Sequence, residues 1–382
     1  MGSVKVDIIN PDIIRELATK FPDNAEKARK KYKSFDKWLR GEDFPTYNQL
    51  VELSKIFNVP FGDFFLEKLP EIEFPIPHYR TFKRGSFQPS KNLKDAVLHA
   101  QKVKNWAREI LIELGHEQLP FAGKYKDNFD VEAVVNELKN LFNVKEGLSA
   151  MSRWVDAFNY LVDRVEEKGI IVIKSSYIEN THRVLDVKEF RGFVLYDDIA
   201  PVVFINNKDS ISAKIFTLIH EVVHVLIGQS ASFDLEELRP AEVEVERFCD
   251  KCTAEFLVPE MELRKIYNPN TELEELAKHF KVSRVVILRR LLDLGFIDEE
   301  SYSQRLRDLY MYYMYDENKY EEEETKKKGG DYYTNLVNYW GRRFLKLMIE
   351  AVNSGIILHT DLLDITKLSF KKIEKLINEG YL

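Results

Sequence analysis

One cluster of residue types in this sequence could bind a metal ion and use it for chemistry. His220 and His224 are four residues apart and Glu221 directly follows the first, which gives the pattern H-E-x-x-H. Residues four apart share one face of a helix, so both imidazoles can bind the same ion. Glu221 would then lie beside the coordination position that a catalytic zinc site leaves open for water. The pattern predicts a metal-activated water with Glu221 as the general base.

The residues around this motif are almost all apolar, from Ile215 to Ile227. Two histidines and a glutamate are costly to bury in such a helix unless they have partners. This cost favours a functional site. The alternative is a helix that carries two histidines by coincidence.

A zinc site with two histidines needs a third protein ligand. Glu246 follows His224 in a separate predicted helix, and Asp250 lies one turn further along the same face. One carboxylate could bind the metal while the other accepts a hydrogen bond from a ligand imidazole and fixes its orientation. Spacing alone leaves a second interpretation open, because nearby glutamates could make this simply an acidic surface helix.

The pattern of apolar residues predicts the elements that must hold this cluster. β-Branched and aromatic runs at 170–173, 190–195 and 201–205 predict strands, the last two forming a hairpin. Helices are expected over about 94–115, 131–142, 151–167, 211–228 and 242–256. The predicted fold class is α+β, mainly helical, with a small antiparallel sheet.

The domain organisation follows from changes in composition along the chain. Short helices separated by tight turns predict a helix-turn-helix module, and prolines mark a linker after it. A second helix-turn-helix-like unit is expected within the central domain, and a charged stretch precedes the last helical region. The predicted parts are the module 1–68, the linker 69–93, the central domain 94–300 with its unit at 271–297, and the C-terminal domain 301–382.

Composition excludes some classes of protein. The chain has 382 residues, a net charge of −7 and two cysteines, so it is neither a disulfide scaffold nor globally attracted to nucleic acid. It has no apolar run of 18 residues, so we expect no membrane span. These features predict a cytoplasmic protein in which any DNA contact depends on a local basic patch.

Several segments together closely resemble the ImmA/IrrE family of bacterial metallopeptidases. They are Arg191-Gly192-Phe193, the run Pro201 to Asn206, the helix Ile215 to His224 and the block Glu246 to Pro259. Trp38, Gly41-Glu42 and Pro45-Thr46 resemble the XRE-like helix-turn-helix module often fused before that domain. Pro75 to Thr81 resembles its usual linker, and the stretch from Gly329 to Phe344 resembles a tail of longer members.

The resemblance implies a zincin-like, gluzincin-type core that binds Zn²⁺ through His220, His224 and Glu246, with Asp250 supporting a ligand. It also implies a zinc-dependent endopeptidase that cleaves a helix-turn-helix repressor and so derepresses mobile-element, prophage or stress-response genes. The alternatives are a DNA-binding transcriptional regulator, or a toxin or defence protein that uses the same site on another protein.

Three details of the site are open to test. The hairpin containing Arg191, Gly192 and Phe193 could offer an edge strand to an extended peptide substrate. Arg290, or a tyrosine, is a candidate for stabilising the oxyanion. Cys249 and Cys252 form C-x-x-C, which is more typical of buried thiols in a core than of a metal site when no second such pair exists.

The N-terminal module carries a basic patch with Lys27, Arg29, Lys30, Lys31, Lys33, Lys37 and Arg40. Such a patch could neutralise phosphates. However, the third helix is short and has few side chains that could read bases. We expect weak DNA contact at most, and protein docking is an equal alternative.

Overall fold

The computed structural model describes residues 5–6, 9–57, 59, 61–66, 68, 89–144, 148–233, 244–310 and 331–382. They belong to two compact units, Met1–Phe74 and Pro75–Leu382, so the division falls within the predicted linker. Most of that linker, and the charged stretch before the last helical region, lie outside the described residues. The described chain is mainly helical with small sheets, which confirms the α+β class.

The first unit is a set of short helices around an aliphatic and aromatic core. The Asn10 side chain caps the first helix by accepting a hydrogen bond from the Asp12 amide, and Gly41 ends the third in the left-handed conformation. Phe35 packs against Trp38 and stacks on Phe57 in the middle of the unit. The elements are α1 (Pro11–Lys20), α2 (Pro22–Lys31), α3 (Phe35–Arg40), α4 (Tyr47–Phe57) and the 3₁₀ helix η1 (Phe61–Phe65).

The second unit is built on a four-stranded sheet with the order β1-β5-β4-β6. β4 and β5 form the predicted antiparallel hairpin, but β1 runs parallel to β5, so the sheet is mixed rather than antiparallel. β6 pairs antiparallel with β4, and neither β6 nor the separate β2–β3 ribbon was predicted. The strands are β1 (Ile171–Ser175), β2 (Tyr177–Ile178), β3 (Asn180–Val184), β4 (Gly192–Leu195), β5 (Val202–Asn206) and β6 (Ala231–Phe233).

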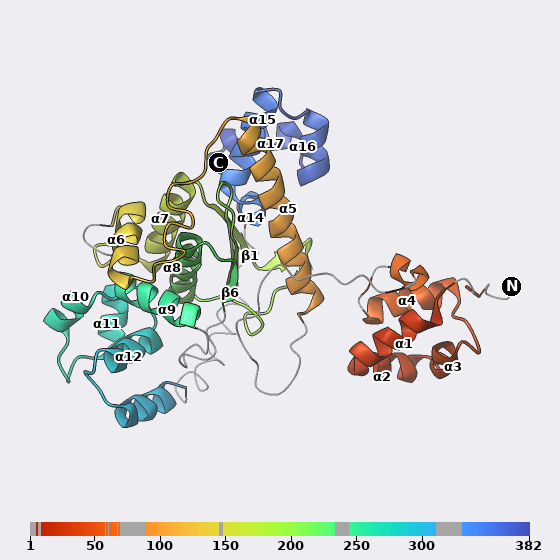
Figure 1. The fold of residues 1–382 in the computed structure, drawn as a ribbon, viewed down its shortest axis with the longest axis horizontal. Coiled ribbons are helices and arrows are strands. Elements are labelled where there is room, and N and C mark those ends of the chain that lie inside the picture. The colour runs from red at the N-terminus through yellow and green to blue at the C-terminus, as the bar shows by residue number, and fades with distance from the viewer. Residues whose placement is uncertain are drawn as a thin grey trace. The chain divides into compact units, whose positions relative to one another are not determined.

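Helices cover both faces of this sheet. On one face lie α7 (Trp154–Glu167) and α8 (Ile211–Ile227), and on the other lies the long helix α5 (Lys91–Glu113) (Figure 1). Every residue of β4 and β5 is buried, as expected for strands covered on both sides. The sheet is therefore a rigid base against which α8, the helix with the H-E-x-x-H motif, is fixed.

The remaining helices of the central domain pack around α8. α9 (Glu244–Leu257) contacts both α8 and α6 (Val131–Phe142). After α10 (Glu260–Ile266), the range predicted as a helix-turn-helix-like unit contains two helices, α11 (Leu273–Phe280) and α12 (Arg284–Asp293). Their side chains extend the same apolar core that contains α8 and α9. After a short turn, residues 299–310 form another helix.

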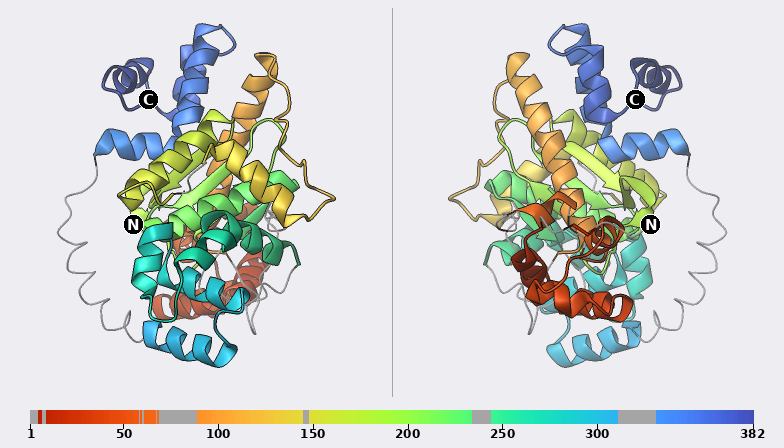
Figure 2. Two further views of the ribbon diagram at one scale, coloured as in Figure 1. Left: turned by 90° about the vertical axis from the view of Figure 1, so that its left-hand side faces the viewer. Right: turned by 90° about the vertical axis from the view of Figure 1, so that its right-hand side faces the viewer.

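The C-terminal helices belong to the second unit and pack on its sheet. α14 (Tyr332–Trp340) and α15 (Arg342–Asn353) contact β1, and α15 also contacts α5 (Figure 2). His99 of α5 lies 2.9 Å from the Tyr339 carbonyl oxygen through its Nε2 atom and joins the two elements. The chain ends with α16 (His359–Thr366) and α17 (Phe370–Asn378).

Candidate metal centre

The helix α8 begins and ends as its sequence predicts. The Ser210 hydroxyl caps its first turn by accepting from the Ala213 amide, and Gly228 ends it with a φ of 73°. Its apolar face packs on the sheet, and its polar residues His220, Glu221 and His224 have no exposed surface. The motif is thus held rigidly inside the domain.

The structure brings His220, His224 and Glu246 together. The two histidine Nε2 atoms are 3.2 Å apart, and the Glu246 carboxylate lies 3.1 Å from His220 Nε2 and 3.3 Å from His224 Nε2. Ligand atoms bound to zinc at its usual bond lengths in a tetrahedron lie about 3.3 Å from one another. Among the described residues, these three buried side chains could hold a metal ion together, and their spacing fits the geometry of zinc.

The Asp250 carboxylate supports this group from behind. It lies 3.1 Å from His220 Nδ1, the ring nitrogen that does not face the cluster. Burial alone would lower the pKa of His220, but hydrogen bonds and charge from Asp250 and Glu246 raise it to about 10. Burial would raise the pKa of Glu246, yet its hydrogen bonds with both histidines lower it well below the usual range. The pocket strongly favours a carboxylate at Glu246.

Glu221 lies within the same buried region, but its chemistry differs from that of Glu246. Burial raises its pKa well above the usual value; the His220 charge opposes this rise, and the Glu246 charge adds to it. Both carboxylate oxygens are buried and have no hydrogen-bond partner among the described residues. Such an arrangement is costly unless a cation or water completes it. This observation supports a metal site with Glu221 beside it.

Sequence analysis missed Thr217, which lies one turn before Glu221 on the same face of α8. Its hydroxyl is buried and also lacks a hydrogen-bond partner in the described part of the chain. Its methyl group lies directly against Gly192, where an added Cβ atom would be only 2.4 Å away. The spacing of four residues before Glu221 was the available signal, because it places both side chains on one helix face.

Cys249 contacts the cluster from the side opposite the metal position. Its sulfur lies 3.8 Å from Nδ1 of His224, whereas Nε2 is the atom that faces the other ligands. Burial is the main cause that raises the pKa of Cys249 well above its usual value, and it raises that of Cys252 to about 12. Both thiols are fully buried and belong to the core, as their pattern suggested.

The predicted substrate edge is not an edge in this structure. β4, which contains Gly192 and Phe193, pairs with β5 on one side and with β6 on the other. Arg191 forms an ion pair with Asp209 at 2.8 Å, which ties the start of β4 to the loop before α8. The prediction of a free edge strand was wrong because three residues after α8 fold back onto β4.

Arg290 has partners away from the ligand cluster. Its guanidinium donates to the Val258 carbonyl oxygen at 3.1 Å and pairs with the Glu255 carboxylate. These bonds fix α12 to the end of α9 in a largely buried position. The contacts indicate a structural role and do not support its proposed action on an oxyanion.

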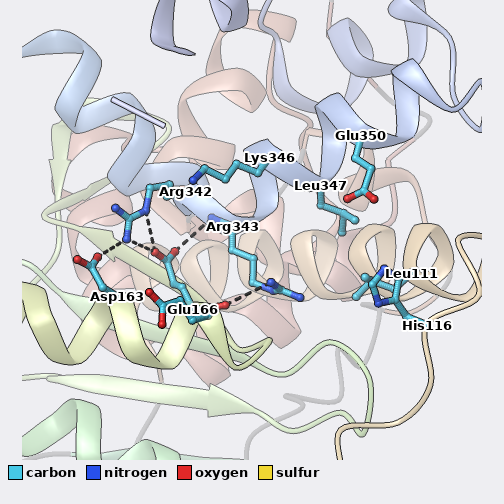
Figure 3. Close-up of a pocket in the computed structure, with 10 residues that line it drawn as sticks. Leu111, His116, Asp163, Glu166, Arg342, Arg343, Lys346, Leu347 and Glu350 are labelled. Carbon is cyan, nitrogen blue, oxygen red and sulfur yellow. Dashed lines mark hydrogen bonds and ion pairs between the residues drawn. The ribbon is translucent and has the colours of Figure 1, made fainter. Parts of the chain in front are cut away.

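A pocket with a volume of about 370 Å³ lies between α5, α7 and α15, away from the ligand cluster. Figure 3 shows Arg342 directed at Asp163 and Glu166, with the Glu166 carboxylate also accepting from the Arg343 amide. The Glu166 carboxylate lies at the N-terminus of α15, where a negative charge interacts favourably with the helix dipole. The charges that line this cavity therefore serve mainly to dock α15 on α7.

The helix with the H-E-x-x-H motif packs against the sheet, and a glutamate from the next helix lies beside both histidines. This is the arrangement of a metallopeptidase. Residues 166–292 match the family model Peptidase_M78, the IrrE N-terminal-like domain. This match supports the ImmA/IrrE resemblance and a metallopeptidase of that type. A search of curated proteins finds no match to the chain.

Proposed function

We propose that this protein is a zinc-dependent endopeptidase. The observation that carries the proposal is the close group of His220 Nε2, His224 Nε2 and the Glu246 carboxylate, with the Glu221 carboxylate buried in the same region and without a hydrogen-bond partner among the described residues. A structural zinc site is usually closed by four protein ligands. Here the described residues supply three, and a general base accompanies them.

The proposed mechanism assigns a role to each side chain. When bound, zinc supplies a Lewis acid that activates water and polarises a carbonyl group. His220, His224 and Glu246 hold the ion, and Asp250 fixes the orientation of the His220 ring through Nδ1. Glu221 accepts a proton from the attacking water at a carboxylate oxygen and delivers it to the nitrogen of the departing amine.

The proposed substrate is a helix-turn-helix transcriptional repressor, whose cleavage would derepress mobile-element, prophage or stress-response genes. The similarity of 166–292 to the IrrE-like domain supports this choice. A repressor substrate would place both proteins in the cytoplasm. The described residues contain no helix with the length and hydrophobicity to cross a membrane.

The first unit adds little DNA-binding capacity to this proposal. Within the basic patch, Lys30 pairs with Glu26 at 2.6 Å and Lys31 pairs with Glu52 at 2.8 Å. Arg29 likewise pairs with an aspartate of α3, at 2.9 Å. The carboxylate of each pair would repel a phosphate, so a paired cation attracts nucleic acid less strongly than an isolated one. We therefore keep the proposal of an XRE-like module with weak, salt-sensitive DNA contact.

Incubation with a helix-turn-helix repressor from the same organism, followed by intact-mass analysis, tests the substrate. We expect one cut by the wild-type protein and none by Glu221→Gln, which keeps the shape of the side chain but cannot act as a base. An unrelated helix-turn-helix repressor is the specificity control. Equal cutting of both repressors would contradict the proposed substrate, whereas an uncut repressor beside another cleaved protein would favour a toxin or defence role.

A further inference from the structure

The pocket between α5, α7 and α15 contains charged side chains that the docking of α15 does not use. Arg342 pairs with Asp163 and Glu166, and the charges of these two acids also act on Lys174 of β1. Two acids and two cations therefore balance one another at this side of the pocket. The rest of its charged and ionisable lining is Arg343, Lys346, Glu350, Glu167 and His116.

Arg343 differs from its neighbour Arg342 in how its charge is balanced. Its guanidinium donates to the backbone oxygen of Glu166 at 3.2 Å, and no carboxylate pairs with it in the described part of the chain. Burial lowers the pKa of Arg343, and the charges of Glu166 and Glu350 only partly oppose this. Burial also acts on Arg342, but its bonds with Asp163 and Glu166 outweigh it and raise the pKa. Most N–H groups of the Arg343 guanidinium are thus left for another acceptor.

A second cation lies beside Arg343. Lys346 follows it by three residues on the same face of α15, lines the same pocket and is exposed. Figure 3 shows the Arg343 side chain directed away from Arg342, toward the part of the pocket that contains Leu111. Among the described residues, neither Lys346 nor Arg343 forms an ion pair.

The charges that remain after pairing are more positive than negative. Glu167 pairs with Arg164 at 2.5 Å, which leaves Glu350 as the one acid of the lining without an ion pair among the described residues. Two cations, Arg343 and Lys346, stand against it. The volume of about 370 Å³ lies within the usual range of small-molecule sites, about 300–1,000 Å³.

We propose that this pocket binds a small organic anion, whose carboxylate or phosphate group is held by Arg343 and Lys346. The planar N–H groups of a guanidinium match two oxygens of either group. Leu111 and Leu347 are buried and offer an apolar wall to the rest of the ligand, and Glu350 can accept from its hydroxyl or amino group. The pocket shares no residue with the metal centre, so this binding function is separate from the proposed peptidase activity.

The position of the pocket gives such a ligand a structural effect. It would join α15 to α7, and α7 packs directly on the metal helix α8. An anion bound there lies one helix away from His220 and His224. It should therefore stabilise the attachment of the C-terminal helices to the central domain.

Isothermal titration of the full chain with succinate and, separately, with inorganic phosphate tests the proposal. Sodium chloride keeps the ionic strength constant, so that a general salt effect does not count as binding. Probes of so few atoms should bind with a Kd on the order of 1 mM. The tighter of the two shows whether the pocket prefers a carboxylate or a phosphate.

Three variants locate the bound ion. Arg343→Gln and Lys346→Gln each remove one charge from the pocket, and Lys371→Gln removes an exposed charge from α17, outside the lining. Thermal unfolding checks that Arg343→Gln is folded, because its guanidinium also contacts α7. Lys346 is exposed, so its replacement leaves the packing of α15 intact.

We expect Arg343→Gln to weaken binding about tenfold and Lys346→Gln about threefold, with no change in Lys371→Gln. If Arg343→Gln does not fold, the charge reversal Lys346→Glu takes its place and should weaken binding more than Lys346→Gln. The proposal is wrong if neither probe saturates the protein below about 50 mM, well above the expected Kd. It is equally wrong if the pocket variants bind as the wild type does, since the ion would then lie elsewhere. Neither readout depends on zinc or cleavage, so failure here leaves the proposed peptidase function untouched.

Discussion

Replacement of Gly192 by alanine should disturb the contact between β4 and the metal helix. The new Cβ atom would lie 2.4 Å from Cγ2 of Thr217 and 2.9 Å from the backbone oxygen of Phe204, far inside normal van der Waals distance. β4 and α8 would have to move apart by about 1 Å to bring the new Cβ atom and Cγ2 of Thr217 to the usual carbon–carbon contact distance. Overpacking of this kind costs about 1–3 kcal/mol, offset by about 0.4–1 kcal/mol from the lower entropy of the unfolded chain.

The net loss of about 1–2 kcal/mol should lower the melting temperature of this large unit by roughly 1.5–3 °C. Cleavage should fall by more, on the order of 100-fold, because a shift of α8 by about 1 Å moves Glu221. Thermal unfolding and the cleavage rate are measured for Gly192→Ala. The double variant Gly192→Ala/Thr217→Ser lacks the clashing methyl group, so it should recover part of the lost stability and part of the lost cleavage. Gly62→Ala is the control, since nothing lies within 4 Å of its added Cβ atom. An unchanged melting temperature and rate in Gly192→Ala would refute this description of the contact.

Three further predictions concern the metal ligands and the C-terminal docking. Asp250→Asn should weaken zinc binding by about 10–100-fold in a competition titration, because it removes the charge 3.1 Å from His220; unchanged affinity would contradict its role. Cys249→Ala should keep one zinc per chain, and loss of the metal would make the thiol a ligand. His99, whose pKa burial lowers to about 4, binds its proton less tightly in the folded chain than in the unfolded chain. The free energy of unfolding, measured by denaturant titration, should therefore fall by about 2 kcal/mol from pH 7 to pH 5. The His99→Gln variant should not show this loss.

The parts of the site that sequence predicted are those determined by local rules. The ends of α8 follow from a serine cap and a glycine in the left-handed conformation, both visible in the sequence. The shared face of His220 and His224 follows from helix periodicity. Glu246 needed the family resemblance, since a glutamate in an acidic helix could equally have faced solvent.

The parts that sequence did not predict depend on contacts between distant segments. β6 has three residues, and it pairs with β4 across the intervening helix α8. The parallel pairing of β1 with β5 likewise joins segments separated by the whole β4 hairpin. Arg290 was a candidate for stabilising the oxyanion, and sequence could not show its pairing with Glu255, which lies 35 residues away and has no local signature.

The most direct test asks whether His220 helps to hold zinc and whether Glu221 acts as the base. It combines native mass spectrometry of the wild type, His220→Ala and Glu221→Gln with cleavage assays on the same preparations. We predict one zinc ion in the wild type and in Glu221→Gln, little or none in His220→Ala, and cleavage by the wild type alone. Full zinc in His220→Ala would place the metal elsewhere, and cleavage by Glu221→Gln would mean that this residue is not the base.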